Sequence, residues 1–286
     1  MMRTTHALLG SLLVLAGAVA PAGAQPAPLA DGPVVYGHHH LLVTDVAAHK
    51  KFWADGLGGT PAKLGTNDAV TFANVIVLFR QGTPAGGTKG TGVNHVGFTV
   101  PDLRAALARL KAAGFADVTK AEAPATLTVV DGVATNAAGT SSIAFVMAPD
   151  EVKVELTEAK GQPAIALHHV HYYTPQVDAM KAWYVKTFGA VGGMRGSFQA
   201  ADLPGVNLTF SPSPDPVVGT KGRSLDHIGF EVKNLEAFCK KLEAAGVTFD
   251  RPYAKNAAIG IGLAFFTDPF GTYIELTEGL GGAIKK

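Results

Sequence analysis

The sequence predicts an α+β protein of four strand–helix–strands modules, arranged as two similar halves. Gly87-Thr88-Lys89-Gly90 recurs at residues 219–222. Five residues after each copy comes a strand histidine, at His95 and His227, so both repeats share an offset of 132 (219 − 87 and 227 − 95). Val154-Glu155-Leu156-Thr157-Glu158 also recurs at residues 274–278. Three matches in the same order indicate an internal duplication.

The first half spans residues 34–158 and holds two modules. We expect a strand at 36–43, a helix at 45–56 and further strand at 69–80. The second module has a strand at 94–100, a helix at 103–114 capped by Asp102, and a last strand at 152–158. Apolar residues recur every three or four positions in the helices and alternate in the strands, which is typical of a two-layer α+β arrangement.

The second half repeats this order at residues 167–280, after a linker at 159–166 that contains Gly161 and Pro163. We expect strands at 167–173, 207–210, 226–232 and 274–278, and helices at 177–188 and 235–245. Asn234 is placed to cap the last helix, and Gly189 and Gly246 are placed to end the two helices.

The N-terminus has the pattern of a cleaved secretory signal. Residues 1–24 combine a basic start, a short apolar run and Ala22-Gly23-Ala24, and residues 25–33 form a Pro-rich leader expected to be disordered. The apolar run is shorter than the ~20 residues that a membrane-spanning helix needs. We therefore expect a secreted or periplasmic protein with no membrane association after cleavage, with an uncleaved N-terminal anchor as the alternative.

Composition narrows the function further. The chain has 24 Lys and Arg against 23 Asp and Glu, which gives no basic footprint for a nucleic acid. Cys239 is the only cysteine, so no disulfide can form within the chain, and its position on an apolar helix face predicts a buried thiol. We expect a small-molecule substrate and either a monomer or a homodimer.

Each module begins with a strand histidine seven residues before the position where its helix starts. The four pairs are His38 and Asp45, His95 and Asp102, His169 and Gln176, and His227 and Asn234. Because this step is constant, two modules that meet across a barrel bring two imidazoles together beside a late-strand glutamate. Two imidazoles and a carboxylate with open positions suit Fe(II), with Mn, Zn and Ni as alternatives.

At this point the chain resembles the vicinal oxygen chelate superfamily, which includes glyoxalase I, bleomycin and fosfomycin resistance proteins and extradiol dioxygenases. The resemblance is most specific at residues 226–230 and 268–276, and it extends over nearly the whole mature chain. It implies four βαβββ modules forming two tandem, glyoxalase-like half-barrel domains.

The family's metal positions carry over onto two sets of residues. They are His169, His227 and Glu275 in the second half, and His38, His95 and Glu155 in the first half. His40 shares a strand face with His38, and His171 with His169, so the register leaves the choice within each pair open.

The chain departs from the family's pattern at two places. A fourth ligand position falls near Leu78 and Thr209; neither is an acid, which favours the two-histidine, one-carboxylate set of dioxygenases over the four-ligand set of glyoxalase I. Extradiol enzymes add a catalytic His and Tyr, whereas the position of that Tyr reads Phe265-Phe266 here. The acid or base of the reaction therefore stays unassigned.

Two functions fit these observations. The first is an exported metal-dependent enzyme that acts on a small substrate with vicinal oxygens, in a dioxygenase-like or a glyoxalase- or lyase-like reaction. The second is a non-catalytic protein that sequesters a small molecule.

Overall fold

The structure, a computed structural model, describes residues 29–30, 32–213 and 215–286. The predicted signal peptide at 1–24 and most of the predicted leader at 25–33 lie outside these residues. Among the helices of the described ranges, none has both the length and the apolar character required to span a membrane.

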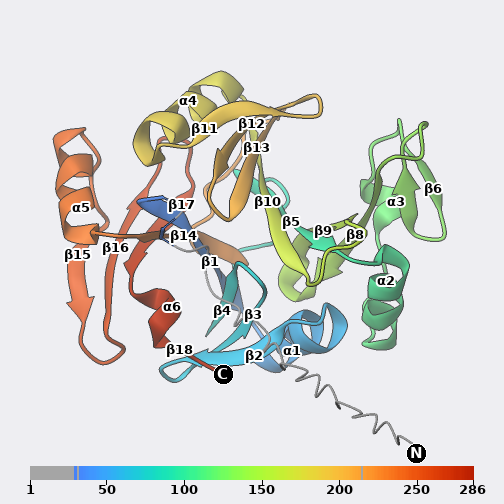
Figure 1. Cartoon of the computed structure of the whole chain (residues 1–286), viewed down its shortest axis with the longest axis horizontal. Coiled ribbons are helices and arrows are strands. Elements are labelled where there is room, and N and C mark those ends of the chain that lie inside the picture. Colours follow the sequence, from blue (N-terminus) through green and yellow to red (C-terminus); the bar gives the residue numbers. More distant parts are fainter. Residues whose placement is uncertain (1–28, 31, 214) are drawn as a thin grey trace, which may run out of the picture.

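The described strands form two nine-stranded sheets (Figure 1). The first sheet has the order β15 (Arg251–Asn256), β16 (Ile261–Thr267), β17 (Tyr273–Glu278), β14 (Leu225–Val232), β1 (Val34–Val43), β4 (Ile76–Gln81), β3 (Asn67–Thr71), β2 (Thr60–Leu64) and β18 (Ile284–Lys285). The second has the order β11 (Val191–Arg195), β12 (Phe198–Leu203), β13 (Val206–Pro212), β10 (Ala166–Thr174), β5 (Val93–Val100), β9 (Val152–Glu158), β8 (Ser142–Ala148), β7 (Val133–Thr135) and β6 (Thr128–Val130).

Each sheet combines one module from each half of the sequence. The first sheet joins the first module, β1–β4, to the fourth, β14–β17, and the second sheet joins the second and third modules. The seams are antiparallel pairs of histidine-bearing strands, β1 with β14 and β10 with β5. The four-module α+β fold is confirmed, but the sheets do not coincide with the sequence halves 34–158 and 167–280.

Each module has a helix after its first strand. They are α1 (Val46–Lys50), which continues as a π-helical segment at Lys51–Gly56, α2 (Leu103–Ala112), α4 (Val177–Phe188) and α5 (Leu235–Ala244). Asp102 and Asn234 cap their helices as predicted, accepting backbone hydrogen bonds from Ala105 and Ala237 at 2.9 and 3.2 Å. Gly189 ends α4 as predicted, in the left-handed conformation with φ of 75°.

The helices pack in one apolar core that extends across both sheets. Trp53, just after α1, lies 5.8 Å from Phe98 of β5, between ring centroids. Phe188, at the end of α4, stacks on Phe230 of β14 at 4.4 Å. Trp53 and Phe188 thus reach strands of the other sheet, while α1 and α4 also lie against the strands of their own modules. The shared core therefore joins the two sheets.

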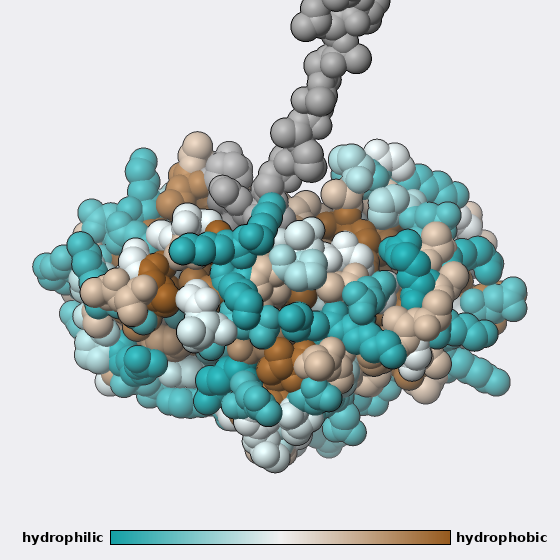
Figure 2. All heavy atoms as spheres, turned by 90° about the horizontal axis from the view of Figure 1, so that it is seen from below, coloured by the Kyte–Doolittle hydropathy of each residue, from teal (hydrophilic) through white to brown (hydrophobic). Residues whose placement is uncertain are grey.

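Several short elements were not predicted. They include α3 (Thr119–Glu122), α6 (Leu280–Ala283), β2, β15, β18 and the hairpins β6–β7 and β11–β12. Most of them are short or largely exposed, and an exposed strand such as β11 lacks the apolar alternation that marks a half-buried strand. Figure 2 shows a face on which hydrophilic side chains predominate and apolar ones form small groups.

Candidate metal centres

Two clusters of metal-ligand side chains lie on the sheet faces opposite the core. Site 1 contains His38, His40, His227 and Glu275, and site 2 contains His95, Glu155, His169 and His171. In each site the candidate ligand atoms all lie within 4.8 Å of one another. Nitrogen and oxygen ligands bind an ion such as Zn²⁺ at about 2.0–2.2 Å, so two ligands of one ion are at most about 4.4 Å apart. Both clusters thus need only a small contraction to hold a metal ion.

In site 1, two imidazoles converge on one carboxylate oxygen. His38 Nε2 and His227 Nε2 each lie 2.9 Å from Oε2 of Glu275. The ring of His40 lies 4.5 Å from that of His227, and both of its nitrogens are buried without a hydrogen-bond partner among the described residues. Buried polar atoms without a partner are rare in proteins, so these nitrogens are placed to contact an ion or a ligand in the site.

In site 2, three imidazoles converge in the same way. His95 Nε2 lies 3.1 Å from Oε2 of Glu155, 3.4 Å from His169 Nε2 and 3.2 Å from His171 Nδ1. His169 Nε2 also lies 3.7 Å from Oε2 of Glu155. A neutral His95 with its one proton on Nδ1 has no hydrogen on Nε2 for these neighbours, whereas one cation can be bound by all four groups.

A glycine beneath one imidazole makes room for each site. His38 lies over Gly229 of the paired strand β14, and a Cβ at Gly229 would stand 1.9 Å from its Cε1 atom. His169 lies over Gly97 of β5 in the same way, with a distance of 2.0 Å. The glycine two residues after His95 and His227 is therefore part of the site's construction, because any side chain there would displace the neighbouring imidazole.

The residue before the histidine orients it, and here the two sites differ. His227 Nδ1 donates to Oδ1 of Asp226 at 2.6 Å, whereas His95 Nδ1 donates to Oδ1 of Asn94 at 2.9 Å. A carboxylate behind a metal-binding histidine fixes the ring and raises its basicity. Burial alone would lower the pKa of His227, but the bonds to Asp226 and Glu275 outweigh burial and raise it. Burial prevails at His95 and lowers its pKa.

The other groups have the protonation states that metal binding requires. Burial opposes ionisation of Glu155, but its contact with His95 and the charge of Arg195 outweigh burial and lower the pKa of Glu155 to about 2. The pKa of Glu275 is lowered too, because His38 and His227 outweigh burial. Burial lowers the pKa of His40, His169 and His171. Ionised carboxylates and neutral imidazoles are the forms that bind metal ions.

All six predicted residues lie in one cluster or the other, but their grouping was wrong. His169 was expected beside His227 and Glu275, and it lies with His95 and Glu155; His38 lies with His227 and Glu275 instead. The physical reason is the sheet pairing, which joins the first module to the fourth and the second to the third. The duplicated sequence identifies the modules but not the partner of each central strand.

His40 and His171 were the alternatives to His38 and His169. In the structure both members of each pair belong to the same cluster. His40 pairs in register with Leu78 and His171 with Thr209, the two positions where an acid is missing. A histidine from the adjacent strand therefore stands beside each missing acid. The spacing of two residues from His38 and His169 was the signal, since residues two apart share a strand face.

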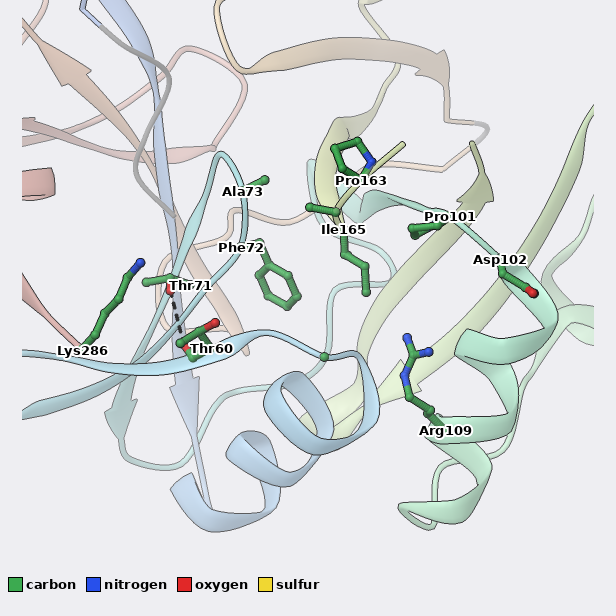
Figure 3. A pocket seen from close by; sticks show the side chains of 12 residues that line it. Thr60, Thr71, Phe72, Ala73, Pro101, Asp102, Arg109, Pro163, Ile165 and Lys286 are labelled. Atoms are coloured by element: carbon green, nitrogen blue, oxygen red, sulfur yellow. Dashed lines mark hydrogen bonds between the residues drawn. The ribbon is translucent and has the colours of Figure 1, made fainter. Parts of the chain in front are cut away.

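A cavity of about 210 Å³ adjoins site 1. His38, His40 and Glu275 line it together with the apolar side chains of Leu64 and Leu78. A second hollow of about 550 Å³ lies between the first module, residues 163–165 and α2, with Phe72 and Ile165 on its wall and Arg109 at its edge (Figure 3). It shares no lining residue with either site, so the 210 Å³ cavity is the candidate ligand space of site 1.

Comparisons with known proteins identify the family and the fold. The sequence model of the Glyoxalase/Bleomycin resistance protein/Dioxygenase superfamily matches residues 35–156 and 166–276. Glyoxylase I 4 of Arabidopsis thaliana is 28% identical over 132 residues, which cover 42% of this chain and 76% of that protein.

Two solved structures share the fold. Glyoxalase I from Zea mays has a TM-score of 0.66 at 16% identity and covers 87% of this chain and 94% of its own. A putative dioxygenase from Bacillus subtilis subsp. subtilis str. 168 has a TM-score of 0.62 at 14% identity, over 89% of this chain and 86% of its own. The family match accounts for most of both halves, and the chain therefore belongs to the Glyoxalase/Bleomycin resistance protein/Dioxygenase superfamily.

Proposed function

We propose that the chain is an exported metal-dependent enzyme that acts on a small substrate with two vicinal oxygens. One observation carries the proposal: each site brings three imidazoles and one carboxylate together in a buried position, with ligand atoms within 4.8 Å. Imidazole nitrogens suit Fe, Zn, Ni and Cu, and a mixed nitrogen and carboxylate set also accepts Mn. Fe(II) is the first metal to test, with Mn, Zn and Ni as alternatives.

In site 1, His38, His227 and Glu275 would hold the metal. A bound divalent ion supplies a Lewis acid that polarises substrate oxygens or an oxygen-activating centre. Asp226 holds the His227 ring in place through the bond at Nδ1, which leaves Nε2 directed at Glu275. Leu64 and Leu78 line the adjoining cavity and exclude water from the reacting atoms.

His40 is the proton acceptor that the proposal assigns to site 1. Reactions of substrates with vicinal hydroxyl or carbonyl groups need a side chain that moves a proton. Both ring nitrogens of His40 lack a partner among the described residues, and the ring lines the adjoining cavity, so it is free to accept a proton from a ligand there. Sequence reasoning left this role unassigned.

Metal content and activity test the proposal together. We expect protein purified without oxygen to carry a transition metal, and we expect His227→Ala and Glu275→Ala to lose it from site 1. Glu236→Ala, which removes an exposed helix carboxylate, is the matched control. Oxygen uptake with a panel of catechols separates a dioxygenase from an oxygen-independent lyase or isomerase. Absence of any bound transition metal, or full activity in both alanine variants, would overturn the proposal.

Export is the second part of the proposal. It is supported by the basic start, the short apolar run and the Ala22-Gly23-Ala24 pattern of the N-terminus. N-terminal sequencing of the protein from a periplasmic extract should begin at Gln25. A mature protein that retains Met1 in the cytoplasmic fraction contradicts export.

Site 2 favours a second candidate, which is binding without turnover. His171 Nε2 is bonded to Ser211 Oγ at 2.8 Å, and its Nδ1 faces His95. No imidazole of site 2 matches the unpartnered His40, so this site would retain a ligand without moving its proton. Recovery of a stoichiometric, chemically unchanged ligand from the protein would support sequestration, and multiple turnovers confined to site 2 would exclude it.

A further inference from the structure

We propose that site 2 binds a small carboxylate ligand with an adjacent oxygen, such as a 2-hydroxy or 2-oxo acid, through Arg195, which has leucine at the equivalent place in site 1. The inference rests on the proposed function, because the ligand's second oxygen needs the metal of site 2. It comes from comparing equivalent positions of the first and third modules.

The first and third modules align without a gap at an offset of 131. The equivalent pairs are His38 and His169, His40 and His171, Leu64 and Arg195, Asn67 and Phe198, and Leu78 and Thr209. Strand register confirms the equivalence: Leu64 pairs with Asn67 as Arg195 pairs with Phe198. His40 pairs with Leu78 as His171 pairs with Thr209. The same place therefore holds a leucine in site 1 and an arginine in site 2.

Arg195 lies on the sheet face that carries the site 2 histidines. Paired residues of neighbouring strands share a face, and so do residues two apart in one strand. Arg195 pairs with Phe198, and Ala200, two residues after Phe198, pairs with Thr209. Thr209 pairs in turn with His171. Arg195 Nε donates to Oγ1 of Thr209 at 2.8 Å, and Thr209 Oγ1 donates to Asn207 at 2.7 Å. The guanidinium is thus held by a buried hydroxyl that Leu78 of site 1 cannot replace.

Arg195 has no ion-pair contact within the described chain. No carboxylate of the described residues lies within ion-pair distance of it, and the bond to Thr209 is its one hydrogen bond to them. Burial lowers the pKa of Arg195, and its charge contributes to the low pKa of Glu155. A half-buried cation without a partner is costly, and an anionic ligand would stabilise it.

The free guanidinium donors suit a carboxylate. With Nε held by Thr209, the two Nη groups remain, and the planar fork of arginine matches the two oxygens of a carboxylate. Phe198 lies 5.3 Å from the His171 ring and 5.7 Å below the guanidinium, which adds an aromatic wall beside it. Such a ligand is a compact acid whose second oxygen lies next to its carboxylate.

Site 1 has a different lining at its cavity. Leu64 and Leu78 occupy the places of Arg195 and Thr209. Arg251 also borders that cavity, but it is exposed, comes from the fourth module and lies over the Phe265 ring at 4.8 Å. The anchored cation is therefore specific to site 2.

Calorimetric titration of the metal-loaded protein with oxalate, a dianion with vicinal oxygens, tests the inference. We expect oxalate to bind more tightly at site 2 than at site 1, and we expect Arg195→Gln to weaken the tighter event by roughly 10- to 100-fold, the effect of losing charge-assisted hydrogen bonds. The oxalate affinity of Arg195→Lys should lie between those of the unaltered protein and Arg195→Gln, because lysine keeps the charge and loses the planar guanidinium. Arg104→Leu, which removes a charge from the exposed surface of α2, should bind oxalate as the unaltered protein does.

The reciprocal exchange tests the same point in site 1. Leu64→Arg with Leu78→Thr should add a second tight oxalate site, detected as a change in stoichiometry and in the absorption of Co(II) substituted at site 1. Metal content is measured for every variant. Unchanged oxalate affinity in Arg195→Gln with full metal content overturns this inference alone, and absence of bound metal from the unaltered protein overturns it together with the proposed function.

Discussion

Replacement of Gly229 by alanine should empty site 1 and leave site 2 occupied. The backbone of Gly229 is ordinary β-strand, so alanine can adopt it. The new Cβ would stand 1.9 Å from Cε1 of His38, and ordinary contact begins at 3.4 Å. The imidazole must therefore retreat by about 1.5 Å (3.4 − 1.9).

That displacement exceeds what a metal site tolerates. Metal–ligand distances hold within about 0.2 Å, so His38 would cease to be a ligand. Loss of a residue that merely supports a ligand lowers metal affinity by about 10- to 100-fold, which sets a lower bound for loss of the ligand itself. We expect site 1 to weaken by at least that factor.

Equilibrium dialysis against limiting free metal, followed by metal analysis, measures the effect. Gly229→Ala should retain one equivalent where the unaltered protein retains two. Gly97→Ala should lose the other equivalent, because its Cβ would stand 2.0 Å from Cε1 of His169. Gly193→Ala places its Cβ in open space and should retain both. Two equivalents held by folded Gly229→Ala at unaltered affinity would refute the reasoning.

Three further predictions concern the surroundings of the sites and the core. Asp226→Asn should weaken metal binding at site 1 by about 10- to 100-fold, and Asn94→Asp should strengthen metal binding at site 2. Chelator competition measures both affinities, and values equal to those of the unaltered protein would contradict the orienting role. Burial outweighs the bonds to Asp268 and raises its pKa to about 6. Ionising this buried carboxyl destabilises the folded state, so the free energy of unfolding of the unaltered protein should rise by about 3 kcal/mol relative to that of Asp268→Asn as pH falls from 7 to below 4. Urea unfolding at several pH values measures the difference, and parallel pH profiles of the two proteins would contradict it. Burial raises the pKa of the Cys239 thiol to about 11, so it should react with a thiol reagent at pH 8 about 100-fold more slowly than an exposed cysteine, until the protein unfolds.

Much of the site could be read from local sequence. The repeated Gly-Thr-Lys-Gly, the strand histidines and the repeated late-strand glutamate identified the modules and six of the eight clustered side chains. Helix boundaries followed too, because Asp102, Asn234 and Gly189 act within one turn of their own positions. These features depend on contacts between near neighbours, which a sequence displays directly.

The sequence by itself therefore determined four α+β modules and the side chains able to bind a metal. Only the tertiary structure decided which of them meet. The pairing of β1 with β14 and of β10 with β5 distributes each half over two sheets, and this exchange places His38 with Glu275 and His169 with Glu155. Four similar strands offer several partners of nearly equal local quality, and packing of the shared core selects among them.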